Sequence, residues 1–98
     1  MAITLNKHAI QCEQIALAGG IITPLSSPRA SIYDISRCWR RLLDATGFPS
    51  GNMPGWNEKE EAAAEVIIAT LIYLQRIGCS NIEQLLREAI ERHARQDE

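Results

Sequence analysis

The sequence predicts an all-α protein with four helices in an antiparallel arrangement. Four segments carry apolar residues at the three- and four-residue spacing of amphipathic helices, and capping residues or glycines mark most of their ends. The breaks between them are short, which favours antiparallel neighbours. A chain of 98 residues, 46% of them hydrophobic, fits a single domain over residues 1–98.

The first two helices have clear starts. Thr4 suits an N-cap and Gly19-Gly20 a helix end, and residues 21–23 offer a short extended piece. Ser27-Pro28 opens the second helix, because serine caps it and proline needs no amide partner in the first turn. That helix is expected to end at Gly47. Its predicted buried stripe consists of Ile32, Ile35, Trp39, Leu42 and Leu43.

A loop rich in proline and glycine, residues 48–56, separates the second and third helices, and we expect it to fold over the end of the bundle. Asn57 and Glu60 predict a capping box for the third helix, which should run to Ile77 before Gly78. From 62 to 74 this helix is apolar nearly all round, so other helices must surround it. One small chain offers few partners, and we expect dimerisation to complete the bundle.

The fourth helix should follow a capping box formed by Ser80 and Glu83. Its opposite face mixes acidic and basic residues and is expected to face solvent. The predicted buried face consists of Ile82, Leu85, Leu86, Ala89 and Ile90.

Charge and cysteine content limit the partners and the compartment. The net charge of -2 argues against a DNA- or RNA-binding surface. The longest apolar run, residues 62–74, falls short of the ~20 residues that span a bilayer, so no membrane partner is expected. Three widely spaced cysteines without a C-x-x-C motif indicate a reducing compartment, and no signal peptide is evident, so we expect the cytoplasm.

Glu65 is the most unusual residue, because it places a carboxylate inside the apolar third helix. A buried carboxylate needs a cation, a metal ion or a proton as its companion. Arg37, Arg40 and Arg41 crowd one turn of the second helix and could supply the cation, or could themselves bind phosphate groups. Glu61, one turn before Glu65, makes a two-carboxylate metal site an open alternative.

The segments 36–45, SRCWRRLLDA, and 61–69, EAAAEVIIA, resemble the two metal-binding helices of the MazG-like all-α nucleoside triphosphate pyrophosphohydrolases. The opening LNKHA is similar to the start of small phage and bacterial members. In this family the two helices read roughly S-E-E-x-x-E-L-x-x-A and E-E-x-x-D-V. The resemblance implies the same helical fold and a relationship to enzymes that use Mg²⁺.

The family's four Mg²⁺-binding carboxylates would fall on Cys38, Arg41, Ala62 and Glu65, of which only Glu65 is acidic. Mg²⁺ requires oxygen ligands, so the resemblance implies a relic site, no catalytic residue and no cofactor, with Arg41 paired to Glu65 in place of the ion. The chain would then be a homo-oligomer that binds a nucleotide or a protein.

Two alternatives remain open at this point. The first is an active Mg²⁺-dependent pyrophosphohydrolase in which Glu61, Glu65 and Asp44 hold the metal in a rearranged site. The second is an unrelated small helical interaction protein, such as a phage-encoded regulator.

Overall fold

The computed structural model describes residues 4–20, 22 and 26–96 of the chain, and the helices there are α1 (Leu5–Ala18), α2 (Pro28–Asp44), α3 (Glu58–Arg76) and α4 (Ile82–Gln96). The described residues contain no strand, only an isolated bridge between Pro49 and Asn57. The all-α prediction is confirmed. The extended piece predicted at 21–23 falls mostly outside the described residues.

Local capping explains most helix ends. Thr4, Ser27 and Asn57 cap α1, α2 and α3 as predicted, and Asn57 forms the full capping box with Glu60. At the end of α3, Gly78 takes a φ of 84°, which an L side chain rarely adopts, and Cys79 N–H donates to the Leu74 carbonyl at 3.0 Å.

The predicted end of α2 at Gly47 is wrong, because the helix stops at Asp44 and Ala45 is extended. The next residue, Thr46, donates its backbone N–H at 3.3 Å, and also its hydroxyl, to the Glu58 carboxylate. These bonds hold the chain on its path toward α3.

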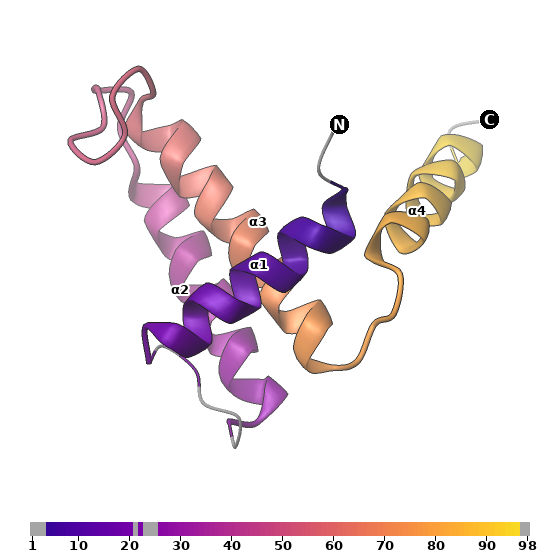
Figure 1. Ribbon diagram of the computed structural model, residues 1–98. Helices are drawn as coiled ribbons and strands as arrows, with labels where there is room; N and C mark the ends of the chain where they lie inside the picture. The colour runs from indigo at the N-terminus through magenta and orange to yellow at the C-terminus, as the bar shows by residue number, and fades with distance from the viewer. Residues whose placement is uncertain (1–3, 21, 23–25, 97–98) are drawn as a thin grey trace.

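The helices α2 and α3 form the main packed pair, with α1 across them and α4 set apart (Figure 1). The antiparallel hairpin of α2 and α3 has the 45–57 loop at its tip. Arg76 ties this unit to α1 through an ion pair with Glu13 at 3.7 Å, and it donates to the Ser26 carbonyl at 2.7 Å. The helix α4 packs chiefly on α1.

The N-termini of α1 and α4 cap each other. Asn6 Oδ1 accepts hydrogen bonds from the backbone N–H of Ile82 at 2.7 Å and of Glu83 at 3.2 Å. In return, Glu83 Oε1 accepts from the Leu5 N–H at 2.7 Å. The predicted Ser80–Glu83 capping box is therefore wrong: Asn81 precedes α4 and accepts from the Gln84 N–H, while Glu83 serves the neighbouring helix.

The core of the described chain is small. Its buried apolar side chains are Ala9, Ala16, Ile22, Ala62, Ala69, Leu71 and Ile82. Three of them, Ala9, Leu71 and Ile82, form one cluster, with Leu5, Cys12, Leu74 and Cys79 packed around it. The predicted burial of the α4 face is wrong for Leu85, Leu86 and Ile90, which are exposed, whereas Ile82 is buried and Ala89 half-buried. The prediction that other helices surround α3 is also not met along its whole length, because Ile67 and Ile68 are exposed.

The buried face of α2 differs from the predicted stripe. Ser31 is the fully buried residue of this helix. Of the predicted stripe, Ile35 and Leu42 are half-buried, whereas Ile32, Trp39 and Leu43 are exposed. The side chains of Phe48 and Trp56 in the 48–56 loop are exposed too, so they do not cover the bundle end as expected. In this chain α2 turns a polar face toward α3 and leaves Ile32, Trp39 and Leu43 of its apolar stripe exposed.

Candidate functional site

A pocket of about 340 Å³ lies between α2 and α3. Such a volume falls at the lower end of the range for small-molecule sites. Its floor is apolar and its rim carries two arginines and two carboxylates. The lining residues are Ile22, Ser31, Asp34, Arg37, Cys38, Arg41, Glu65, Ile68, Ala69 and Ile72.

One face of α2 supplies the polar wall of this pocket. Ser31, Asp34, Cys38 and Arg41 stand at i, i+3, i+7 and i+10, which is the spacing of a single helical face. Asp34 forms an ion pair with Arg37, one turn further along the helix. The wall therefore presents both signs of charge above a buried serine.

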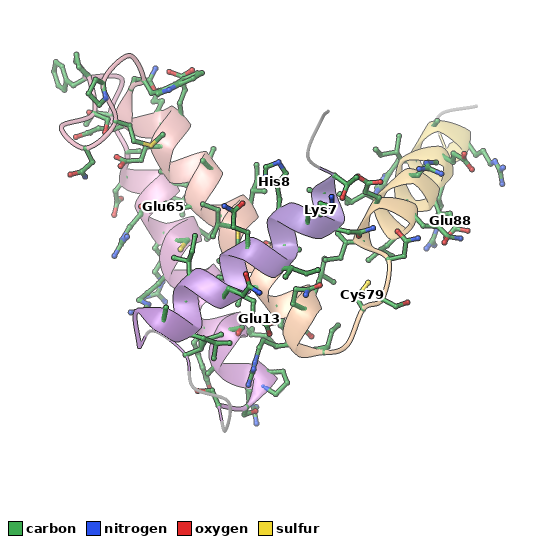
Figure 2. All side chains as sticks on the ribbon, in the orientation of Figure 1. Lys7, His8, Glu13, Glu65, Cys79 and Glu88 are labelled. Carbon is green, nitrogen blue, oxygen red and sulfur yellow. The ribbon has the colours of Figure 1, made fainter. Side chains whose placement is uncertain are left out.

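Arg41 Nη1 lies 3.3 Å from Glu65 Oε2, so the predicted contact between these two residues is present. The prediction that Glu65 is deeply buried is wrong, because its side chain is 37% exposed and that of Arg41 is 65% exposed. Figure 2 shows Glu65 at the α2–α3 pair. Pairs this exposed contribute at most about 1 kcal/mol to stability, so the contact positions the two groups more than it holds the fold.

A second pocket, of about 450 Å³, continues the same groove toward the 45–57 loop, and Arg41 and Glu65 line both pockets. Ala62 is buried beside this second pocket. The structure thus brings the four resemblance-derived positions, Cys38, Arg41, Ala62 and Glu65, into one groove. Chemically they offer a thiol, a guanidinium, a methyl group and one carboxylate.

The carboxylates proposed for a rearranged metal site, Glu61, Glu65 and Asp44, line one pocket but form no metal-binding cluster. Within residues 4–20, 22 and 26–96, no three His, Cys, Asp or Glu side chains form a group that could hold a metal ion. Glu61 accepts a hydrogen bond from Ser50 Oγ at 2.9 Å, which ties it to the loop. Asp44 and Glu65 line the second pocket together with Glu61 but complete no such cluster.

Among the described residues, Arg37, Arg40 and Arg41 form no ion pair with the acidic first turn of α3. Glu58 binds Thr46 and Glu60 closes the capping box, so these acids organise the loop and the helix start. Among the three arginines, Arg37 and Arg41 line the first pocket, whereas Arg40 lines only the neighbouring ones.

Sequence reasoning missed the buried Ser31 as part of this site, and it did not predict that Asp34 pairs with Arg37. Ser31 is 2% exposed and sits two turns before Cys38 on the same face. The signal was the polar i, i+7 spacing, which the stronger apolar stripe of α2 concealed.

The cysteines differ in their surroundings. Cys38 faces the pocket, whereas Cys12 packs against the core cluster. Burial raises the pKa of the Cys12 thiol, so it is less ionised at neutral pH than an exposed thiol. All three cysteines are free thiols in the described residues.

Comparison with protein-family models, curated proteins and solved structures finds no significant match to this chain. Across the described part of the chain, none of the helices combines the length and apolar content needed to cross a bilayer.

Proposed function

We propose that this chain is a MazG-like helical module that binds a phosphate-bearing nucleotide in the α2–α3 pocket without hydrolysing it and without a metal ion. The observation that carries this proposal is the combination, in one pocket, of an apolar floor and two rim guanidiniums, Arg37 and Arg41. The free thiols of the described residues suit a reducing compartment such as the cytoplasm.

The donor set does not fit Mg²⁺. This ion takes near-octahedral oxygen ligands, and the reaction would need it to neutralise the triphosphate and activate water. The thiol of Cys38, the guanidinium of Arg41 and the methyl group of Ala62 replace carboxylates where the resemblance places them. Glu65 alone, already in contact with Arg41, cannot hold the ion in that geometry.

The ion pairs leave the arginines able to bind a ligand. A guanidinium has five N–H donors, and Arg41 uses one of them in its 3.3 Å hydrogen bond to Glu65. Its exposed side chain lets the remaining donors reach a phosphate in the pocket mouth. The apolar floor, which includes Ile68 and Ile72, suits a base or another flat apolar group.

The charge balance of the rim favours a nucleotide of low charge. Two carboxylates, Asp34 and Glu65, offset the two guanidiniums, so the rim is neutral overall. A triphosphate would place its extra negative charges next to these carboxylates. We therefore expect nucleoside monophosphates to bind at least as tightly as the corresponding triphosphates.

Isothermal titration with adenosine and guanosine mono- and triphosphates in EDTA tests this proposal. Arg41→Gln and Arg37→Gln should each weaken monophosphate binding by about tenfold or more, since a charge-assisted hydrogen bond contributes about 1.5–3 kcal/mol. Arg29→Gln is the matched control, because Arg29 is an exposed arginine of α2 that lines neither pocket of the groove. Undetectable binding, or equal losses in all three variants, would refute the proposal.

A hydrolysis assay separates the proposal from the enzymatic alternative. We expect no pyrophosphate release from nucleoside triphosphates with Mg²⁺ or Mn²⁺. Release that depends on the metal and disappears in Glu65→Ala would establish an active pyrophosphohydrolase instead.

A further inference from the structure

The most buried polar side chain of the α2–α3 pocket is Ser31. It is 2% exposed, and it lines the pocket together with Ile22 and Ala69, which are buried, and Ile72, which is half-buried. The helices that enclose this part of the pocket, α2 and α3, lie side by side (Figure 1). One hydroxyl is therefore set into an otherwise apolar part of the pocket.

Among the residues that the structure describes, none forms a hydrogen bond with the Ser31 hydroxyl. Hydroxyls inside helices often bond to a backbone carbonyl of the preceding turn, as Thr70 does on α3 with the Val66 carbonyl at 2.8 Å. A buried hydroxyl without a partner destabilises a protein, so each one requires an explanation. Because Ser31 lines the pocket, the molecule that occupies the pocket can supply the partner.

The charged groups of the pocket lie further along the helices. On α2, Arg37 and Arg41 follow Ser31 by about 9 Å and about 15 Å along the helix axis. Asp34 is nearer to Ser31, but it is paired with Arg37. The pocket therefore has its guanidiniums toward one end and the single hydroxyl toward the other.

The residues of α3 follow the same division. Glu65 lies beside Arg41, with 3.3 Å between Glu65 Oε2 and Arg41 Nη1. Because α2 and α3 run antiparallel, the later residues of α3 that line the pocket, Ala69 and Ile72, lie toward the Ser31 end. Both helices thus make one end of the pocket charged and the other end apolar.

A mononucleotide has the same division of polarity. Its phosphate is anionic and suits the guanidiniums. Its base has flat faces that suit apolar walls, and an edge that carries hydrogen-bond donors and acceptors. With the phosphate at Arg37 and Arg41, the base extends toward Ser31, whose hydroxyl can both donate and accept.

We propose that Ser31 recognises the base of the bound nucleotide through a hydrogen bond between its hydroxyl and the edge of the base. This inference rests on the nucleotide binding proposed above and adds the residue that determines specificity. A ligand whose ring has no polar edge would leave the buried hydroxyl unpaired, so the pocket favours a nucleobase over an apolar ring of the same shape.

Ser31→Ala tests the proposal, because the substitution removes only the hydroxyl. Isothermal titration with adenosine monophosphate in EDTA should give a dissociation constant about fivefold or more above that of the wild-type protein, as expected for one neutral hydrogen bond. Ser36→Ala is the matched control, because Ser36 is an exposed serine of α2 that lines neither pocket of the groove, and it should bind like the wild-type protein.

Ribose 5-phosphate locates the contact on the ligand, because it keeps the sugar and phosphate of the nucleotide and lacks the base. Competition with adenosine monophosphate measures its affinity. Ser31→Ala should bind ribose 5-phosphate as the wild-type protein does. A loss as large as that for adenosine monophosphate would show that Ser31 does not act through the base, and would overturn the proposal.

Thermal unfolding of the ligand-free protein separates recognition from a structural role of Ser31. Because no described residue pairs with the hydroxyl, Ser31→Ala should unfold at the same Tm as the wild-type protein or at a higher one. A Tm clearly below that of Ser36→Ala, or a variant that does not fold, would assign the hydroxyl to the fold and overturn the proposal.

The titrations also distinguish this inference from the function on which it rests. If the wild-type protein and Ser31→Ala bind adenosine monophosphate equally tightly, the base contact is refuted and nucleotide binding stands. If the wild-type protein binds neither adenosine nor guanosine monophosphate, both proposals are refuted.

Discussion

The mutual capping of α1 and α4 gives a quantitative prediction for Asn6→Ala. The substitution removes the oxygen that accepts from the Ile82 N–H at 2.7 Å and the Glu83 N–H at 3.2 Å. Both bonds are half-buried, and each contributes about 1 kcal/mol net. We therefore expect the free energy of unfolding to fall by about 2 kcal/mol, the upper end of measured N-cap losses.

The assay is urea denaturation followed by circular dichroism, with all proteins at one concentration, because the dimerisation expected from the sequence would make stability concentration-dependent. A loss of about 2 kcal/mol corresponds to a fall in Tm of roughly 8–16 °C for a domain of this size. Hydrogen exchange should show faster exchange at the amides of Ile82 and Glu83, because these two donors lose their acceptor.

Gln11→Ala is the control for this experiment. Gln11 is exposed on α1, away from the contact, and its replacement should change stability by less than about 0.5 kcal/mol. If Asn6→Ala costs no more than Gln11→Ala, the capping contact does not hold α4 to α1 and the reasoning fails.

Two further predictions concern the core. Ile82→Ala should lower the free energy of unfolding by about 2–5 kcal/mol in urea denaturation, because Ile82 is 1% exposed. Ile77 is half-exposed and serves as the control, so an equal loss in Ile77→Ala would contradict this prediction. Burial raises the pKa of Cys12, so at pH 8 iodoacetamide should alkylate this thiol more slowly in the native protein than in urea, and the native rate should rise with pH. Peptide mapping measures both rates. Equal rates would show that the fold does not protect Cys12.

Most helix boundaries could be predicted from the sequence because they depend on bonds between near neighbours. Thr4, Ser27 and Asn57 each accept a hydrogen bond from an N–H two or three residues later. The end of α3 is local in the same way, since the positive φ of Gly78 and the backbone hydrogen bonds at this helix end involve only the adjacent turn. Such contacts form wherever the segment is helical.

The candidate site could be predicted only in part. The resemblance drew attention to Arg41 and Glu65, and the structure places them in contact across the groove. Residue spacing alone could not show whether Glu61, Glu65 and Asp44 bind a metal ion. Glu61 accepts a hydrogen bond from Ser50, which lies on the loop between α2 and α3, and helical periodicity does not predict the path of a loop.

The sequence by itself determined that the chain is helical, where most helices begin, and which positions are apolar. Only the tertiary structure decided which face of α2 meets α3, how Asn6 reaches Ile82 across 76 positions, and that the apolar sides of α2 and α4 stay uncovered. Periodicity records that a face avoids water but not which surface covers it, because burial by the same chain and burial by a second molecule remove apolar area from water equally well.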